Sequence, residues 1–330
     1  MNALVTGGGG FLGMAIVRRL LERGARVSTL SRLAHPALGD LRVEQILGDV
    51  ADAGVVARAV EGRDVVFHTA AKAGVWGAFE DYHRTNFIGT QNVVAACRRH
   101  GVPRLVYTSS PSVVFDGKDM ENVDESAPYP ARFEAHYPRT KAMAEQWVRQ
   151  AADGRLATVS LRPHLIWGPG DNHLLPRLAS RARAGQLRRI GPGGKLIDTI
   201  YIDNAAEAHL LAAERLAPGS ALSGKVYFIS QGEPVETWEM INRLLGTAGA
   251  PAVERAIPAR AALMLAGCFE LWHRLSRNAR EPRLTRFVVK ELCAAHWFNI
   301  TAARRDLGYE PRVSITEGLA RTKAAGRGAA

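Results

Sequence analysis

The sequence predicts an α/β fold, a doubly wound parallel sheet with a smaller, discontinuous C-terminal lobe. Three observations lead to this fold class. Short apolar segments alternate with segments of helical periodicity through the first half of the chain. Four glycines, Gly7 to Gly10, separate the first apolar segment from the first helical one. Beyond about residue 161 the alternation becomes irregular, and Gly- and Pro-rich turns interrupt it.

The expected strands are short and apolar, as parallel strands buried on both faces should be. They cover residues 3–5, 26–30, 43–47, 64–68 and 105–109. Helical periodicity covers residues 11–23 and 90–100, and a further helix is expected over 137–150. Because parallel strands are joined by crossover connections, we expect helices on both faces of the sheet.

The composition is that of a globular protein with an excess of basic residues. Of the 330 residues, 47% are hydrophobic and 23% are charged, and the formal net charge is +11. A basic surface can attract nucleic acid, anionic lipid or acidic metabolites. We expect no nucleic-acid partner, because the sequence has neither a compact basic stripe interleaved with aromatic residues nor a DNA-binding motif.

The cysteine pattern and the N-terminus indicate a cytoplasmic protein. Cys97, Cys268 and Cys293 are isolated and have no CxxC spacing, which is typical of a reducing compartment. The ten histidines show no metal-ligand spacing, so no metal site is expected. The chain begins without the basic and apolar regions of a signal peptide, and no apolar run reaches the ~20 residues of a membrane span.

The N-terminal segment Thr6-Gly7-Gly8-Gly9-Gly10-Phe11-Leu12-Gly13 predicts a Rossmann-type turn that binds the pyrophosphate of a dinucleotide. Gly7 permits the tight turn, Gly10 lets the backbone approach the phosphates, and Gly13 lets the helix pack close to the sheet. The helix N-terminus, at Phe11 and Leu12, presents N–H groups and the positive end of the helix dipole to the phosphates. The segment lies between an expected strand and an expected helix, which is the context that this motif requires.

The end of the second strand predicts NADP(H) as the cofactor. NAD-selective sites usually carry an acidic residue here, which binds the adenosine ribose. This chain has Ser31-Arg32 instead, with no acid before Asp40. A guanidinium group can pair bidentately with a 2′-phosphate, which an acid would repel. The alternative is that Arg32 is a solvated loop residue.

Tyr137 and Lys141 are spaced as neighbours on one face of the helix expected over 137–150. A free phenol has a pKa of ~10 and donates a proton slowly near neutral pH. A nearby ammonium group lowers this pKa, so the pair can deliver a proton to a carbonyl oxygen. Ser110, at the end of the strand expected over 105–109, can donate to the same oxygen. Combined with the glycine turn, the pattern predicts an enzyme that adds a hydride and a proton to a carbonyl group.

Six motifs in this order make the chain resemble the extended short-chain dehydrogenases/reductases of the 3β-hydroxysteroid dehydrogenase/isomerase-like branch. They are Thr6-Gly7-x-x-Gly10-x-x-Gly13, Gly48-Asp49, His68-Thr69-Ala70-Ala71, Tyr107-Thr108-Ser109-Ser110, Tyr137-x-x-x-Lys141 and Arg162-Pro163-x-x-x-x-Gly168-Pro169. The resemblance implies that Ser110, Tyr137 and Lys141 are the catalytic residues, with Ser109 as the alternative to Ser110. Tyr137 and Lys141 would also contact the cofactor.

The same resemblance implies further cofactor contacts. Asp49 and Val50 would lie near the adenine, Ala70 and Ala71 near the ribose, and Pro163 beside the nicotinamide. The family often has Tyr-Gly-Pro after Arg-Pro, whereas this chain has Trp167-Gly168-Pro169 and one extra residue in the gap.

Segments 70–77, 165–177, 201–206 and 292–297 are similar to those of family members that reduce long-chain 2-alkyl-3-oxo acids in bacterial olefin biosynthesis. This resemblance implies NADPH-dependent reduction of the 3-oxo group, in a site with an apolar channel and a group that meets the acid. The candidates for the channel are Trp76, Trp167, Leu174 and Leu175, and those for the acid are His164, His173 and Arg177. Packing within the core or the lobe is the alternative role for each.

Three other functions stay open. A steroid or sterol 3β-dehydrogenase would use the same triad in the oxidative direction, and a nucleotide-sugar epimerase or reductase would need a polar, phosphate-binding pocket. A non-enzymatic NADP-binding scaffold or redox sensor is the alternative from another class. The presence of both Tyr137 and Lys141 favours an enzyme.

We expect residues 1–166 to form the NADP-binding Rossmann domain and residues 167–330 the substrate-binding lobe. Strand-like residues 225–230 indicate that about 198–230 returns to the Rossmann core. Residues 256–275 are partly amphipathic, and we expect a helix that packs on the lobe. Docking to a membrane surface or to a partner in a multi-enzyme assembly is the alternative. A homo-oligomer is compatible with the sequence, and the tail from Lys323 is expected to fray.

Overall fold

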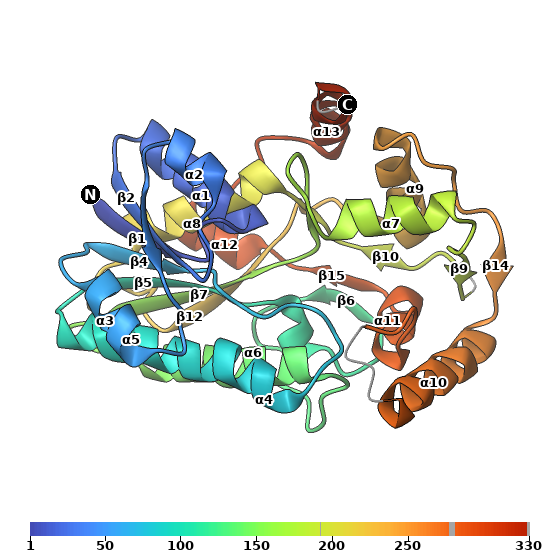
Figure 1. Cartoon of the computed structure of the whole chain (residues 1–330), viewed down its shortest axis with the longest axis horizontal. Helices are drawn as coiled ribbons and strands as arrows, with labels where there is room; N and C mark the ends of the chain where they lie inside the picture. The colour runs from blue at the N-terminus through green and yellow to red at the C-terminus, as the bar shows by residue number, and fades with distance from the viewer. Residues whose placement is uncertain (192, 277–280, 329–330) are drawn as a thin grey trace.

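A parallel seven-stranded sheet forms the centre of the protein, which confirms the predicted fold class (Figure 1). The computed structural model describes residues 1–191, 193–276 and 281–328. The strand order is β12-β7-β5-β4-β1-β2-β3, and every neighbouring pair is parallel. The strands are β1 (Asn2–Thr6), β2 (Arg26–Ser31), β3 (Glu44–Leu47), β4 (Val65–His68), β5 (Arg104–Thr108), β7 (Ala157–Pro163) and β12 (Lys225–Ile229).

Helices cover both faces of this sheet (Figure 1). On one face α1 (Phe11–Glu22) and α12 (Thr301–Leu307) pack against α8 (Ile202–Arg215). On the other, α5 (Gly89–Arg99) packs between α3 (Ala53–Val60) and α6 (His136–Gln150). The short α2 (Pro36–Asp40) follows β2, and its Leu38 is buried in the same apolar cluster as α1. Each layer buries an apolar stripe, Ile16 and Leu20 of α1 on one face and Val93 and Cys97 of α5 on the other. Removing these stripes from water stabilises the layers.

The smaller lobe contains three short sheets and an apolar cluster of its own. The sheets have the strand orders β13-β10-β15-β6, β11-β8 and β14-β9. Their strands are β6 (Met120–Val123), β8 (Ile166–Trp167), β9 (Arg189–Ile190), β10 (Leu196–Ile197), β11 (Ile200–Tyr201), β13 (Val235–Glu236), β14 (Ala256–Ile257) and β15 (His296–Phe298). The helices are α7 (Leu174–Arg183), α9 (Thr237–Thr247), α10 (Ala259–Leu275), α11 (Arg286–Cys293) and α13 (Ile315–Gly328).

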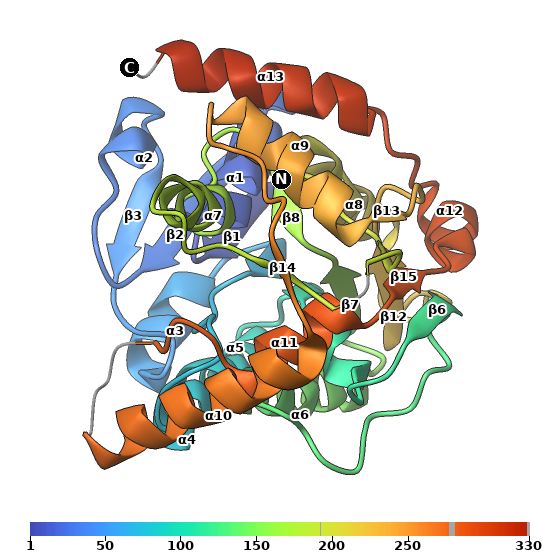
Figure 2. The same ribbon diagram turned by 90° about the vertical axis from the view of Figure 1, so that its right-hand side faces the viewer.

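The lobe's apolar cluster joins four of these helices through Ala179, Trp238, Ala266 and Val289, among others. Figure 2 shows α10 and α11 side by side at the outer edge of the lobe. β12 completes one edge of the large sheet, so the chain returns to it after the first part of the lobe. The domain boundary at residue 166 stays a prediction.

The helix expected over 90–100 is confirmed as α5, and it continues earlier helical turns, α4 (Phe79–Tyr82) and the π-helical η1 (His83–Ile88). Two local expectations were wrong. Residues 256 and 257 are not helical, because they pair with β9 as β14 and Pro258 then sets the start of α10. The tail does not fray at Lys323: α13 is helical to Gly328, with Leu319 packed against the core. No helix within the described ranges is long and apolar enough to cross a membrane.

Candidate active site

Tyr137 and Lys141 lie at the carboxyl end of β5. Helix α6 begins at His136, so both side chains project from one face of its first two turns. The Lys141 ammonium group donates to the carbonyl oxygen of Thr108, the last residue of β5. It also lies 4.3 Å from the centre of the Tyr107 ring, a cation–π contact. These contacts fix the lysine at the end of β5, one helical turn beyond Tyr137.

The structure distinguishes the two candidate serines. Ser110 directly precedes the 3₁₀-helix η2 (Pro111–Val114), and its hydroxyl group lies close enough to Tyr137 to lower the pKa of the phenol. Ser109 is buried, and its hydroxyl instead helps to lower the pKa of Glu145. Ser110, rather than Ser109, therefore lies with Tyr137 and can donate to an oxygen bound there.

Burial sets the protonation of these groups. Burial raises the pKa of Tyr137, and the Ser110 hydroxyl group opposes this rise. Burial lowers the pKa of Lys141 to about 7, although the neighbouring negative charge of Glu145 raises this pKa. Lys141 can therefore gain or lose a proton near neutral pH.

Glu145, one helical turn beyond Lys141, forms a buried ion pair that sequence analysis missed. Its carboxylate accepts from the Nε and Nη2 atoms of Arg162 in β7 at 2.9 and 2.6 Å, and from the Tyr129 hydroxyl group at 2.6 Å. The signal was present, because Tyr137, Lys141 and Glu145 repeat the same four-residue spacing on α6. The pair anchors the face of α6 that carries Tyr137 and Lys141 to the sheet.

The glycine turn packs directly against the end of β4. Gly7 has a φ of 72°, and a Cβ atom there would lie 2.9 Å from the Cα atom of Ala70. A Cβ atom at Gly13 would lie 2.2 Å from the carbonyl oxygen of Gly7. Any larger residue would push the turn and the helix apart, so both glycines are required by close packing.

Groups suited to phosphate lack partners around this turn. Helix α1 begins after Gly10 without a side-chain cap, so the N–H groups of Phe11 and Leu12 have no acceptor in the helix. The buried hydroxyl group of Ser31 has no hydrogen-bond partner among the residues that the structure describes. Within the described part of the chain, the exposed Arg32 makes no ion pair or hydrogen bond. An orphaned hydroxyl beside an unpaired guanidinium group fits a phosphate.

The other predicted cofactor residues follow strands of the same sheet. Asp49 follows β3 and pairs with Arg84 at 2.9 Å. Val50 is buried among the apolar residues between the sheet and α5. Ala71 is exposed after β4, and the buried Pro163 is the last residue of β7. Their positions at carboxyl ends of parallel strands are those from which open α/β sheets bind ligands.

Asn86, in the π-helical η1, is a second residue that sequence analysis missed. Its amide group donates to the Lys72 carbonyl oxygen and the Thr140 hydroxyl group, both at 3.1 Å, and accepts from the Lys72 N–H group at 2.7 Å. It therefore links the segment after β4 to α6. The sequence offered no periodicity for this residue, since a π turn departs from the helical repeat.

A cavity of about 630 Å³ lies between the sheet edge and the lobe. Apolar side chains dominate its lining, among them Val75, Leu165, Met240, Leu244, Phe269 and Val288. Since His164 and Leu165 directly follow β7, the cavity extends to the carboxyl end of that strand, while Ser110, Tyr137 and Lys141 are not among its lining residues. Its volume and apolar lining suit a ligand with a hydrocarbon chain.

Of the predicted substrate residues, His164, Trp167, Leu174 and Arg177 line this cavity. The other three lie elsewhere among the described residues: the Trp76 ring contacts His273 and Arg274 of α10, His173 is exposed before α7, and Leu175 packs against the core. Arg177 is not available as a free cation, because it forms two hydrogen bonds with Glu281. The Trp167 indole donates to Thr199 at 3.0 Å.

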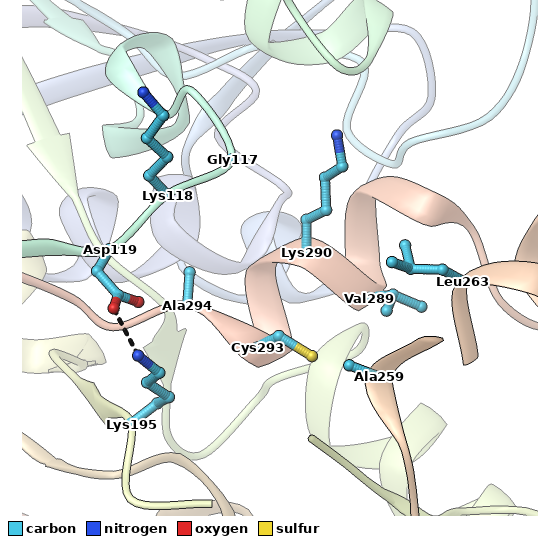
Figure 3. Close-up of a pocket in the computed structure, with 10 residues that line it drawn as sticks. All are labelled: Gly117, Lys118, Asp119, Lys195, Ala259, Leu263, Val289, Lys290, Cys293 and Ala294. Carbon is cyan, nitrogen blue, oxygen red and sulfur yellow. Dashed lines mark hydrogen bonds and ion pairs between the residues drawn. The ribbon is translucent and has the colours of Figure 1, made fainter. Parts of the chain in front are cut away.

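Figure 3 shows a second, smaller cavity of about 390 Å³, lined by Val289, Lys290 and Cys293 of α11. It contains none of the predicted site residues. Each of its lysines has an acidic partner, in the pairs Lys118–Asp116, Lys195–Asp119 and Lys290–Glu134. Across the described ranges, no group of three or more His, Cys, Asp or Glu side chains could hold a metal ion.

Known proteins of similar sequence and structure agree with this geometry. The model of the 3-beta hydroxysteroid dehydrogenase/isomerase family matches residues 4–257. The 2-alkyl-3-oxoalkanoate reductase of Stenotrophomonas maltophilia is 54% identical over 98% of this chain and 99% of its own length. The protein of that name from Shewanella oneidensis is 45% identical, over 98% and 86%.

Among solved structures, the UDP-glucose 4-epimerase of Thermus thermophilus in complex with NAD is 26% identical, with a TM-score of 0.75 and coverage of 100% of both chains. The sheet, the glycine turn and the Ser-Tyr-Lys arrangement are thus accompanied by a family match over most of the chain. The chain belongs to the 3-beta hydroxysteroid dehydrogenase/isomerase family, and it is an enzyme, a dehydrogenase/reductase of the extended short-chain type.

Proposed function

We propose that this enzyme reduces a long-chain 2-alkyl-3-oxoalkanoic acid to the 2-alkyl-3-hydroxyalkanoic acid, with NADPH as the reductant. The observation that carries the proposal is the apolar cavity of about 630 Å³ that reaches the sheet edge beside Pro163. An apolar cavity favours a hydrocarbon chain over a sugar nucleotide. The names of the two relatives at 54% and 45% identity support the same substrate class.

A nicotinamide dinucleotide fits the unpartnered groups at the sheet edge. The N-terminus of α1 would hold the pyrophosphate, and the orphaned hydroxyl group of Ser31 with the unpaired Arg32 would hold a 2′-phosphate. Asp49, the acidic residue that follows β3, forms an ion pair with Arg84, so its charge would not repel that phosphate. When bound, NADPH would supply a hydride to the 3-oxo carbon.

The chain's own residues handle the oxygen of that carbonyl group. Ser110 and Tyr137 would donate hydrogen bonds to it and polarise the bond, and Tyr137 would deliver its proton as the alkoxide forms. Charged Lys141 would stabilise the resulting tyrosinate. Asn86 and Glu145 would position these groups, since they hold the segment after β4 and the face of α6.

The partner of α10 in this proposal is a lipid surface. The helix buries only Ala262, Ala266 and Glu270, and it exposes Met264, Leu271, Trp272 and Leu275. Arg260 and Arg274 of this helix form no ion pair with any described residue, and the chain as a whole is basic, so anionic lipid is the complementary partner. Leu265 and Phe269 of the same helix line the cavity, so a long-chain substrate would enter beside the bilayer.

The proposed reaction is tested most directly in reverse, with a stable substrate. Purified enzyme, NADP⁺ and a long-chain 2-alkyl-3-hydroxy acid should give an absorbance rise at 340 nm, and NAD⁺ should support a slower rise. A 3β-hydroxysterol and UDP-glucose serve as controls. No turnover of the hydroxy acid, with turnover of either control, would overturn the proposal.

A further inference from the structure

One carboxyl group in the cavity has no role in the mechanism above. Glu291 lies on α11, and Thr285, Val288, Glu291 and Leu292 of that helix region line the large cavity. Their spacing is that of one helical face, whereas Val289 and Cys293 line the smaller cavity. Glu291 is thus the acidic side chain that α11 presents to the apolar space.

The Glu291 carboxyl group has no partner within the described chain, in contrast to the other acids nearby. Glu281 pairs with Arg177, and Glu270 of α10 pairs with Arg286. Burial alone raises the pKa of Glu291 to about 8. The group therefore keeps its proton at neutral pH, and an acid of this kind can donate a hydrogen bond.

Glu291 also lies close enough to Tyr137 to act on it, since a charge on Glu291 raises the pKa of the phenol. The other titratable or charged groups around it come from the cavity and from the elements packed against α11. The cavity contributes His164, His296, Arg177, Arg181, Arg188, Glu281 and Arg283, β9 contributes Arg189, and α10 contributes Arg260, Glu270, His273 and Arg274. Burial lowers the pKa of both histidines, so these rings are neutral at pH 7.

A 3-oxo acid presents two oxygen-bearing groups separated by a single carbon. With the keto oxygen on Tyr137, its carboxylate must lie in the adjacent part of the cavity, away from water. Leaving that charge unpaired in an apolar space would be costly. A neighbouring acid that retains its proton can compensate it through a charge-assisted hydrogen bond.

We propose that Glu291, as a neutral carboxylic acid, donates a hydrogen bond to the carboxylate of the 3-oxo acid whose keto oxygen is bound by Tyr137. This inference rests on the proposed function and names a substrate-binding residue for it. Tyr137 and Glu291 would thus recognise the keto group and the carboxylate of one substrate, and an ordinary ketone lacks the second of these groups.

The test compares a long-chain 2-alkyl-3-hydroxy acid with its methyl ester, as the ratio of their kcat/KM values with NADP⁺. Tyr137 and Lys141 act on both compounds, so their titration cancels from the ratio. We expect the wild-type ratio to fall as the pH rises through about 8, because ionised Glu291 repels the carboxylate. Glu291→Leu should lower the ratio at pH 7 about tenfold or more, the effect of one charged hydrogen bond.

Glu291→Gln is the matched variant, because its amide group still donates but does not titrate. Its ratio should stay high at pH 7 and lose the decline above pH 8. This variant also decides the matter if Glu291→Leu does not fold. A Glu291→Gln ratio that still declines like wild type, or a Glu291→Leu ratio equal to wild type, would overturn the inference. Failure of the wild type to oxidise either compound would instead overturn the proposed function.

Discussion

Replacing Glu145 by Gln tests the ion pair that supports α6, the helix of Tyr137 and Lys141. The substitution preserves the shape of the side chain and removes its charge, so Arg162, which is 1% exposed, is left without a counter-ion. Removing one partner of a buried pair costs ~3–5 kcal/mol, because the remaining charge keeps its desolvation penalty. An amide oxygen can still accept one of the two hydrogen bonds from Arg162. We therefore expect the free energy of unfolding to fall by ~3 kcal/mol, the lower end of that range.

Denaturant unfolding at pH 7 measures this loss. The matched control is the double variant Glu145→Met with Arg162→Met, which leaves no buried charge. It should be more stable than Glu145→Gln, because an apolar pair of similar volume avoids the desolvation penalty. A loss below ~1 kcal/mol for Glu145→Gln, or a double variant less stable than it, would refute this reasoning.

The same variant has a defined pH dependence. Burial raises the pKa of Glu145, but the hydrogen bonds and the charge of Arg162 outweigh this effect. They hold the pKa below its ordinary value. The stabilisation is thus complete above the ordinary Glu pKa of ~4.3 and is lost as the pH falls through the lower pKa of the folded state. The difference between wild type and Glu145→Gln should be constant above about pH 5 and shrink in acid. Since Glu145 also raises the pKa of Lys141, activity of the variant should decline at a lower pH on the alkaline side.

Three further predictions concern the proton donor, the cofactor and the lipid surface. Tyr137→Phe should lower kcat at least ~100-fold while NADPH binding, followed by fluorescence, is retained; substantial turnover would exclude Tyr137 as the donor. Arg32→Glu should weaken NADPH binding about tenfold or more and leave NADH binding little changed, whereas Arg26→Glu at the other end of β2 should change neither. Equal losses for both cofactors would count against the 2′-phosphate contact. Trp272→Ser should reduce sedimentation of the enzyme with phosphatidylglycerol vesicles. Trp147→Ser, which changes an exposed tryptophan of α6, should not reduce it. Equal binding by both variants would contradict a lipid contact through α10.

The parts of the fold that the sequence predicted are those encoded by residues close together in the chain. The glycine turn and the Tyr137–Lys141 spacing each lie within eight residues or fewer, and the structure places both at one sheet edge. β7 was harder to anticipate, because polar Thr158, Ser160 and Arg162 alternate with its apolar residues. Such a pattern is typical of a strand with one solvated face. Here the polar face is buried, since the Thr158 hydroxyl group donates to the Val148 carbonyl oxygen and Arg162 pairs with Glu145.

The substrate site shows the limit of reasoning from single residues. Leu174, Arg177, Leu178 and Arg181 line the cavity, and they repeat the spacing of one helical face, so the periodicity of α7 would have selected them as a set. His173 precedes the first turn of that helix and is exposed. Trp76 lies in a loop, where no periodicity fixes the direction of a side chain. Candidate site residues that share one helical face are therefore better supported than an aromatic residue or a histidine selected by its residue type alone.

Glu291 extends this argument across the fold. The helical period of α11 places Val288, Glu291 and Leu292 on the face that lines the cavity. Nothing near Glu291 in the sequence predicts that it lies close to Tyr137, which is 154 residues earlier. Glu291 acts on the Tyr137 phenol because β15, which follows α11, pairs with β10 and β6 and so holds the C-terminal part of the chain in the lobe. A glutamate is ordinarily solvated. Where the topology places it in an apolar cavity without a partner, it can bind a polar group of a ligand. Its chemistry there follows from burial, and the variants at Glu291 separate that chemistry from simple packing.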